Sequence, residues 1–377
     1  MLKSRDIRKK ILSFINPFIL IAIAIVVVMS VVILRTGIFA GLITSSSEGW
    51  VIAALAFLPL LLLCTIIYAS IRYNSIVAVL YTISVVWFPA ILYLFLGTIV
   101  FAIIYLGGMY FNYPVDPKML GWGIIGLVGI MVVYGIANAE NVRITEYAIE
   151  SPELTKKWAG KKIAIISDVH LGVVRRGHFT KRISAMINEL KPDMVIIAGD
   201  IIDGPVFDYE KGLAPLKKIT PPDGLIYAQG NHEGYNWEPE KFYPVIEKLT
   251  TTLIDKTILV DGVQVVGLAY AHESKEETKK RLYTAGYNPE LPSLVILHDP
   301  TNTQALQNEG ASLVISGHTH KGQFFPFNLF MKPIYKEFAY GKNVKGKTTS
   351  ITTSGIGTMM PPLRLGSNPE IVVLTFK

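Results

Sequence analysis

The sequence predicts a protein in two parts: an all-α region of several transmembrane helices, followed by an α/β domain. Three observations support this division. Charged residues are scarce in the first part and common in the second, long apolar stretches fill the first part, and short β-branched runs alternate with helical stretches in the second. We therefore expect a transmembrane region over residues 1–137, a linker over residues 138–160 and a folded domain over residues 161–377.

Charge separates the two parts clearly. Of 377 residues, 51% are apolar and only 17% are charged, so the chain is more apolar than an average soluble protein. Residues 1–137 contain 8 Lys and Arg and 3 Asp and Glu, whereas the remaining residues contain 28 and 26. The net charge of +7 thus divides into +5 and +2. The second part has no stripe of basic and aromatic residues, so no nucleic-acid partner is indicated.

Four apolar stretches in the first part are candidate membrane spans, because about 20 apolar residues in a helix cross the hydrocarbon core of a bilayer. They cover residues 15–34, 50–69, 75–106 and 120–137. We expect an integral multi-pass protein of the cell membrane, with the lipid bilayer as a partner. A cleaved signal peptide is the alternative for the first stretch, but no small-x-small cleavage site follows it.

The side of the membrane on which the domain lies depends on the third stretch, which is long and contains Pro89. If this stretch is one tilted or kinked span, there are four spans, and the basic N-terminal leader and the domain both lie in the cytoplasm. If it is a hairpin that turns near Pro89, there are five spans and the domain lies outside. We favour four spans because no turn residues or charges accompany Pro89.

In the second part, five short apolar runs are each followed directly by polar residues that can bind metals. The runs are residues 163–167, 194–198, 225–229, 294–297 and 313–316, and the residues that follow them include Asp168, His170, Asp200, Asn231, His232, His298, His318 and His320. Ligand sites of open α/β sheets lie at the carboxyl ends of the strands. We therefore expect these side chains to form one site.

The histidines and the single cysteine narrow the chemistry of this site. Five of the seven histidines follow the predicted strands, while the only cysteine, Cys64, lies in an apolar stretch, so a cysteine-based zinc site is excluded. A large set of imidazole and carboxylate ligands suits two divalent ions, which can clamp the oxygens of a phosphoryl group. Asp200 is the candidate bridging carboxylate. His232 is the candidate proton donor to the leaving group.

The motifs resemble those of the calcineurin-like metallophosphoesterases, in order and in approximate spacing. They are Asp168-x-His170, Gly199-Asp200-x-x-Asp203, Gly230-Asn231-His232-Glu233, His298 and Gly317-His318-x-His320. The resemblance is to the membrane-anchored bacterial and archaeal subfamily in particular, whose last motif usually reads Gly-His-Thr-His-Gly-Gly-Gln. Here Lys321 replaces a glycine of that motif. The resemblance implies a β-sandwich flanked by helices.

The same resemblance implies a dinuclear site. One ion would be held by Asp168, His170, Asp200 and His320, and the other by Asp200, Asn231, His298 and His318, with Asp200 as the bridge. The ions would be manganese, zinc, iron or magnesium. His232 would be the general acid. Asp203 is expected to orient ligands or backbone, and Asp299 to orient His298.

Four cationic residues are candidates for binding substrate phosphate: Arg175, Arg176, Lys321 and Arg364. Each has an alternative interpretation. Arg175 and Arg176 would otherwise form a solvated basic loop, Lys321 would point into solvent, and Arg364 would form a structural ion pair.

The function expected from these motifs is hydrolysis of a phosphodiester or pyrophosphate bond by a metal-activated water. The membrane spans favour a lipid-linked or nucleotide-linked substrate. UDP-diacylglucosamine is one candidate, because some members of the subfamily resemble the hydrolases that cleave it. A phosphomonoesterase, including a protein phosphatase, is the alternative. A non-catalytic membrane sensor or scaffold would be marked by lost ligands, and none is lost here. The oligomeric state is left open.

Overall fold

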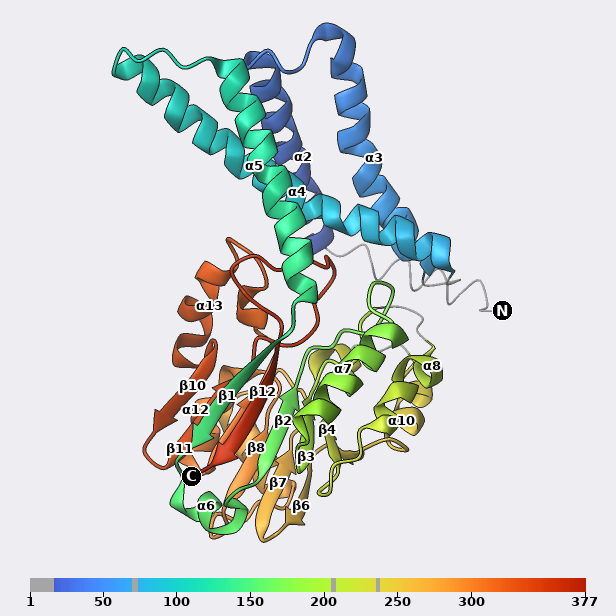
Figure 1. Ribbon diagram of the computed structural model, residues 1–377, viewed down its shortest axis with the longest axis vertical. Helices are drawn as coiled ribbons and strands as arrows, with labels where there is room; N and C mark the ends of the chain where they lie inside the picture. The colour runs from blue at the N-terminus through green and yellow to red at the C-terminus, as the bar shows by residue number, and fades with distance from the viewer. Residues whose placement is uncertain (1–16, 70–73, 205–207, 235–237) are drawn as a thin grey trace. The chain divides into compact units, whose positions relative to one another are not determined.

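A computed structural model describes residues 17–69, 74–204, 208–234 and 238–377 (Figure 1). The chain forms two compact units, Met1–Tyr134 and Gly135–Lys377. The division falls inside the last helix of the apolar part, so the end of that helix belongs to the second unit. Each unit is described by itself.

The first unit is helical. Its helices are α2 (Pro17–Phe39), α3 (Ser45–Ala69), α4 (Ser75–Tyr110) and the greater part of α5 (Pro117–Glu140). Within the described residues, α3, α4 and α5 are long and apolar enough to cross a membrane, and residues 23–39 of α2 form a shorter apolar helix. The apolar side chains Ile25 and Ile103 are 53% and 67% exposed, as expected for helices that face lipid. The unit therefore has the character of a membrane region.

The long third stretch forms one helix. α4 runs from Ser75 to Tyr110 without a break at Pro89, so the hairpin considered as an alternative is absent from this part of the described chain. A helix of 36 residues is about 54 Å long, well beyond the roughly 30 Å of a bilayer core. The start of the first predicted span, at residues 15–16, and the basic leader before it lie outside the described residues.

The second unit is built on two mixed six-stranded sheets, whose strand orders are β1-β12-β2-β3-β4-β5 and β10-β11-β9-β8-β7-β6. The first sheet contains β1 (Arg143–Ile149), β2 (Lys162–Ile166), β3 (Met194–Ala198), β4 (Leu225–Ala228), β5 (Thr251–Leu253) and β12 (Glu370–Phe376). The second contains β6 (Lys256–Val260), β7 (Val263–Gly267), β8 (Ser293–Ile296), β9 (Leu313–Ser316), β10 (Gly341–Lys345) and β11 (Thr348–Thr352). All five predicted strands are present.

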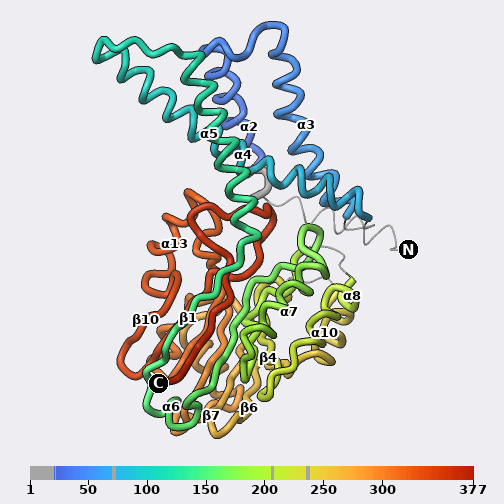
Figure 2. Tube along the Cα trace, in the orientation of Figure 1, coloured from blue at the N-terminus to red at the C-terminus, as the bar shows by residue number. Residues whose placement is uncertain are grey.

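The chain path explains why the sheets are mixed. β2, β3, β4 and β5 run parallel, as expected for strands joined by crossover helices. The C-terminal strand β12 then inserts between β1 and β2, parallel to β1 and antiparallel to β2 (Figure 2). The second sheet likewise has a parallel centre, β7-β8-β9-β11, with the antiparallel strands β6 and β10 at its edges.

The two sheets pack face to face around one apolar core. Ile165 of β2 and Ile196 of β3 meet Leu294 of β8 and Ile315 of β9 there, and all four are fully buried. A strand that is buried on both faces has a continuous run of apolar residues in its sequence. The five strands were predicted from runs of this kind.

Helices cover the outer faces of the sheets. On the first sheet, Phe179 and Ile183 of α7 and Phe242 of α10 pack on Ile197 and its neighbours. On the second sheet, α11 and α12 pack through Leu282 and Leu306. The bounds of the helices in this unit are α6 Pro152–Trp158, α7 Gly177–Leu190, α8 Tyr209–Leu213, α9 Asn231–Gly234, α10 Pro239–Ile246, α11 Lys275–Thr284, α12 Thr303–Asn308 and α13 Asn328–Tyr335, with short 3-10 turns at Ala214–Lys218, Pro300–Asn302, His320–Gly322 and Lys336–Phe338. The β-sandwich flanked by helices is confirmed.

Candidate metal centre

The loops that follow five strands bring the predicted ligands to one place. β2, β3 and β4 of the first sheet supply three loops, and β8 and β9 of the second supply two. The residues that these loops carry are Asp168, His170, Asp200, Asn231, His232, His298, His318 and His320. Three groups of side chains in this set lie close enough to hold a metal ion. The site therefore lies where the two sheets meet at their carboxyl-terminal edge.

The first group is Asp168, His170 and His320. Nε2 of His320 lies 3.3 Å from a carboxylate oxygen of Asp168, and the Nε2 atoms of His170 and His320 are 3.0 Å apart. All three residues are buried. Two imidazole nitrogens and a carboxylate oxygen thus converge on one point.

The second group is Asp200, His298 and His318. Nε2 of His298 lies 3.1 Å from Oδ2 of Asp200. Oδ1 of Asn231 lies 2.7 Å from Nδ1 of His318, which brings the amide into the same group. This set offers two imidazoles, an amide oxygen and a carboxylate.

Asp200 lies between the two groups. Its Oδ2 is 3.9 Å from Nε2 of His170, in the first group, and 3.1 Å from Nε2 of His298, in the second. Its Oδ1 accepts a hydrogen bond from the backbone N–H of His232. The third group consists of His170, Asp200 and His232, so it shares Asp200 with the second group. No other carboxylate among the described residues belongs to two of the three groups.

The backbone is strained at the ligands. Asp168, His170, Asp200, His318 and His320 all have φ between 49° and 67°, a region that non-glycine residues rarely adopt. Such strain persists only where the surrounding structure enforces it, and it concentrates at functional sites. The turns aim the side chains inward.

Glycines leave the room that these turns need. A Cβ on Gly230 would lie 2.2 Å from Oδ1 of Asp200, and one on Gly317 would lie 2.5 Å from Oδ2 of Asp168. Both distances are far inside van der Waals contact. The glycines in the motifs are therefore part of how the ligands are packed.

The electrostatics of the site suit bound cations. Burial lowers the pKa of His170 to about 3 and that of His320 well below its ordinary value, so both imidazoles are neutral, the form that binds metal. Burial alone would also lower the pKa of His298, but Asp200 and Asp168 outweigh it and raise that pKa to about 10. The two carboxylates around His298 therefore favour a positive charge at this position.

Two buried nitrogens of the set have no hydrogen-bond partner, Nδ1 of His170 and Nε2 of His298. A buried polar atom without a partner is unfavourable. Nε2 of His298 points toward Asp200, where a cation would satisfy both groups. The mixed nitrogen and oxygen ligands fit divalent ions such as manganese, zinc, iron or magnesium.

His232 is less buried than His170, His298 and His320, because its side chain is 19% exposed, close to the 23% of His318. Its Nδ1 lies 3.0 Å from Oδ1 of Asp203, and its Nε2 lies 4.0 Å from Oδ2 of Asp200. Burial would lower the pKa of His232, but the hydrogen bond with Asp203 and the charge of Asp200 outweigh it and raise the pKa to about 9. Asp203 thus orients a histidine, in keeping with the expectation that it orients groups of the site.

Glu233 is a residue of the site whose role sequence reasoning missed. Its buried carboxylate accepts hydrogen bonds from the backbone N–H groups of Asp200, Ile201, Ile202 and Gly230. Burial and the charge of Asp200 raise its pKa to about 7. Its place directly after Asn231-His232 was the only available signal, because three of the four bonds come from backbone atoms that are 31 to 33 residues away in the sequence.

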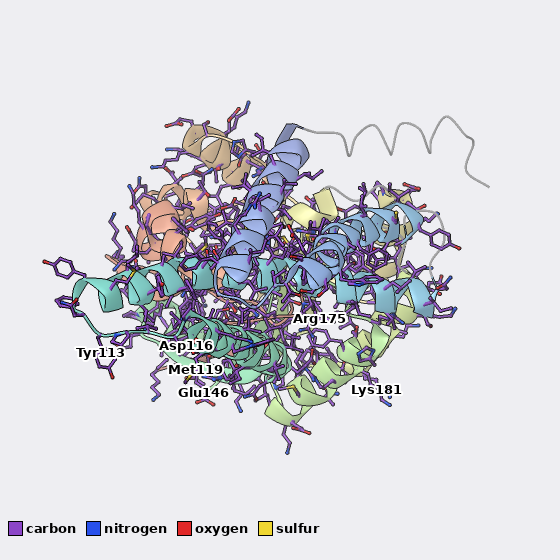
Figure 3. The ribbon with its side chains drawn as sticks, turned by 90° about the horizontal axis from the view of Figure 1, so that it is seen from above. Tyr113, Asp116, Met119, Glu146, Arg175 and Lys181 are labelled. Atoms are coloured by element: carbon purple, nitrogen blue, oxygen red, sulfur yellow. The ribbon has the colours of Figure 1, made fainter. Side chains whose placement is uncertain are left out.

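Arg175 is not placed to bind substrate phosphate. Its side chain is buried, and it pairs with Glu140 at 3.1 Å and donates to the carbonyl of Ala139 at 3.0 Å. Its planar group also stacks on Phe179, 4.1 Å from the ring centre. Lys181 on α7, by contrast, points away from the unit (Figure 3). Arg175 therefore joins the end of α5, which is part of the second unit, to the rest of that unit.

Arg364 is fully buried and engaged with backbone carbonyls, so a substrate-contacting role is not supported. Its guanidinium donates to the carbonyls of Ser354, Gly355 and Gly357. Its Nη2 also lies 3.3 Å from Nδ1 of His320. Within the described part of the chain it forms no ion pair, and its buried side chain supports the candidate ligand His320.

The remaining candidates are only partly exposed. Nζ of Lys321 lies over the ring of Tyr340, 4.2 Å from its centre, and Nε of Arg176 donates to the carbonyl of Val173. The expectation that Asp299 orients His298 is wrong. Asp299 lies 3.7 Å from Nε2 of His318, while the backbone carbonyl of Ala198 is the neighbour of Nδ1 of His298, at 2.7 Å.

Comparisons with known proteins agree with this geometry. Residues 161–322 match the family model described as calcineurin-like phosphoesterase. A transmembrane protein with metallophosphoesterase domain from Danio rerio is 27% identical over 67% of this chain and 61% of its own length. An uncharacterized metallophosphoesterase from Helicobacter pylori is 29% identical over 62% and 63%. The chain thus spans about three fifths of these relatives.

Among solved structures, a dimetal phosphatase from Danio rerio covers 58% of this chain and 99% of its own, with 11% identity and a TM-score of 0.33. The match of residues 161–322 includes the strand-end motifs from Asp168 to His320. Residues 161–322 therefore resemble the calcineurin-like phosphoesterase family, as the motifs predicted.

Proposed function

We propose that the protein is a membrane-anchored phosphoesterase that uses two divalent metal ions to hydrolyse a phosphodiester or pyrophosphate bond. The observation that carries this proposal is the position of Asp200 between two groups of metal-binding side chains. A single structural ion would not need a second group. Two ions bridged by a carboxylate are the arrangement that phosphoryl transfer uses to neutralise charge on the phosphoryl oxygens.

We assign the ligands as follows. Asp168, His170, Asp200 and His320 hold one ion, and Asp200, Asn231, His298 and His318 hold the other. Bound ions would act as Lewis acids and lower the pKa of the attacking water. In this proposal the positions of the ions are set by imidazoles and carboxylates on strained turns, and the rings of His170 and His320 are buried and neutral.

His232 donates a proton to the leaving-group oxygen in this proposal. Its partial exposure leaves it open to substrate, and the contact of its Nδ1 with Asp203 orients the ring so that Nε2 faces the site. The hydrogen bond with Asp203 raises the pKa of His232 and so favours the protonated imidazole that a general acid requires. Its nitrogen also lies within one of the groups able to hold a metal, so its role needs a direct test.

The substrate class follows from the tether. Only residues 141–142 separate the end of α5 from the start of β1, so the domain is held at the membrane by its own chain. We propose that the substrate is lipid-linked or membrane-proximal, with a nucleotide-linked lipid such as UDP-diacylglucosamine as the first candidate. We further propose four spans and a cytoplasmic domain, for which the unbroken helix α4 is the support.

The test uses the full chain, purified in detergent and loaded with manganese, zinc, iron or magnesium in turn. Hydrolysis of bis-p-nitrophenyl phosphate is compared with that of p-nitrophenyl phosphate and of a lipid pyrophosphate. We expect metal-dependent cleavage that EDTA abolishes, preference for diester or pyrophosphate, and loss of activity together with loss of bound metal in Asp200→Asn. His178→Ala is the matched control, because His178 is an exposed histidine outside the site.

The outcomes separate the alternatives. A preference for the monoester would replace the proposed reaction by that of a phosphomonoesterase. Absence of cleavage with every ion, in protein that binds two metals and unfolds cooperatively, would contradict an enzymatic role and favour a sensor or scaffold. Equal rates on lipid pyrophosphate and soluble diester would contradict the lipid-linked substrate while leaving the metal centre intact.

A further inference from the structure

Helix α13 and the turn before it expose a group of large apolar side chains. This α13 patch consists of Phe325, Phe327, Leu329, Phe330 and Ile334, whose exposed fractions run from 38% to 61%. α13 itself has no fully buried residue. Five large apolar side chains exposed within ten residues exceed the scattered single exposures normal for a protein surface. A partner that covers them is therefore expected.

The charges around the patch indicate what kind of partner this is. Lys332 and Lys336 are exposed beside it, and Glu337 is the only acidic residue in residues 321–340. Aromatic and aliphatic side chains flanked by lysines are typical of segments that lie in the interfacial layer of a membrane with anionic lipids. Anionic headgroups complement the lysines and the boundary layer complements the apolar side chains, so a bilayer fits both parts of this surface.

The position of the patch within the second unit points the same way. Phe325 donates a backbone hydrogen bond to Leu365, and the adjacent Arg364 donates one to the carbonyl of Gly135 in α5. Asn138 of α5 donates to the carbonyl of Arg364. These hydrogen bonds connect the patch, through residues 364 and 365, to the last turns of α5. The earlier residues of the same helix are apolar and belong to the membrane region.

The patch also adjoins the metal centre. The ring of Tyr335, at the end of α13, lies 6.2 Å from the ring of the candidate ligand His318. α13 packs on the short turn His320–Gly322, where a Cβ on Gly322 would lie 2.4 Å from the backbone of Asn328. A partner that binds α13 would therefore lie next to the metal centre.

We propose that the α13 patch binds the interfacial layer of an anionic bilayer and so holds the metal centre at the level of the lipid headgroups. The inference rests on the proposed membrane anchoring and deepens the proposed substrate class, but it does not depend on catalysis. Its chemistry has two parts: burial of apolar side chains in the boundary layer, and attraction of Lys332 and Lys336 to anionic headgroups.

Spin labelling of the full chain tests this directly. Cys64 is the only cysteine, so a Cys64→Ser background allows single labels at Leu329→Cys or Ile334→Cys. Leu259→Cys is the matched control, because Leu259 is 65% exposed on β6, the opposite edge strand of the second sheet from β10. Each protein is placed in nanodiscs of phosphatidylcholine with phosphatidylglycerol, and collisions of the nitroxide with oxygen and with a water-soluble nickel complex are measured.

We expect labels at residues 329 and 334 to collide more with oxygen and less with nickel than the label at residue 259. In nanodiscs of phosphatidylcholine alone, or with Lys332→Glu and Lys336→Glu, nickel collisions at residues 329 and 334 should rise. Unchanged collisions in both cases would overturn the anionic part of the proposal.

Two results would overturn the proposal as a whole. Nickel collisions as frequent as those at residue 259 would show that the patch faces water. Dipolar broadening between labels at residue 329 would show that a second copy of the chain covers it. Phosphoesterase activity is measured on the same nanodiscs, so that failure of the proposed reaction, with protection of the labels intact, is distinguished from failure of membrane contact.

Discussion

The carboxylate of Glu233 accepts a hydrogen bond from the backbone N–H of Asp200, at 2.9 Å. The same carboxylate accepts from the N–H groups of Ile201, Ile202 and Gly230, so one buried side chain holds two loops of the site together. Asp200 needs this support because its φ of 52° is unfavourable for a residue with a side chain. Glu233 therefore positions the candidate bridging ligand without itself facing a metal.

Replacing Glu233 with glutamine should weaken the site through this support. The amide can accept through only one of its two heavy atoms, so the hydrogen bonds to the other carboxylate oxygen are lost, at about 1.5–3 kcal/mol. We expect a lower unfolding temperature in detergent, fewer bound metal ions per chain by mass spectrometry, and reduced hydrolysis. Glu240→Gln, at an exposed glutamate nearby, is the control. Full metal content in Glu233→Gln would contradict a positioning role.

Replacing Gly317 with alanine should disturb metal binding through crowding. The new Cβ would lie 2.0 Å from Oγ of Ser167 and 2.5 Å from Oδ2 of Asp168, so the candidate ligand must move. Overpacking of this kind destabilises by about 1–3 kcal/mol. Gly267→Ala is the matched control, because its Cβ would lie 2.4 Å from Cβ of Leu253, away from the site. Both variants should unfold at lower temperature, but only Gly317→Ala should bind less metal while folded; equal metal content would count against the crowding argument.

Replacing Arg175 with alanine tests the corrected role of this residue. Its buried side chain bonds to Glu140 and to the carbonyl of Ala139, so its removal should destabilise the second unit by about 1.5–3 kcal/mol. We expect a lower unfolding temperature and an unchanged KM. The control is Arg182→Ala, which removes a 40% exposed partner of the same glutamate and should change stability little. A raised KM with unchanged stability would restore the phosphate-binding interpretation of Arg175.

The sequence predicted the strands and the ligand-bearing loops because that information is local. Each candidate ligand directly follows an apolar run of its own strand, and a run buried on both faces can be recognised without knowing its neighbours. The sequence did not predict that Arg175 and Arg364 are buried, because their partners depend on long-range packing. Arg175 forms an ion pair with Glu140 of α5, and Arg364 donates a hydrogen bond to the backbone carbonyl of Gly357. From sequence alone, an arginine or lysine near a motif is equally compatible with binding substrate and with a structural role in holding the site together.

The same limit explains the placement of Asp299. Adjacency in sequence to His298 suggested that it orients that ring, yet the two side chains have different partners. Nδ1 of His298 faces the carbonyl of Ala198 on the neighbouring sheet. Asp299 instead lies near His318 from β9. The packing of the two sheets determines which histidine lies beside the carboxylate of Asp299, and a local sequence pattern does not contain that information.

The role of His232 can be tested by varying the leaving group. A proton donor matters most when the departing oxygen is a poor leaving group, and it contributes on the order of 10²- to 10⁴-fold to such reactions. We therefore expect His232→Ala to slow hydrolysis of alkyl phosphodiesters strongly and that of bis-p-nitrophenyl phosphate much less. Asp203→Asn should produce a weaker form of the same selectivity, because it removes the charge that orients and protonates the imidazole across a 3.0 Å contact. Metal content measured alongside separates this role from ligation: an equal loss of rate on both substrates, accompanied by loss of one metal ion, would make His232 a ligand instead of a proton donor.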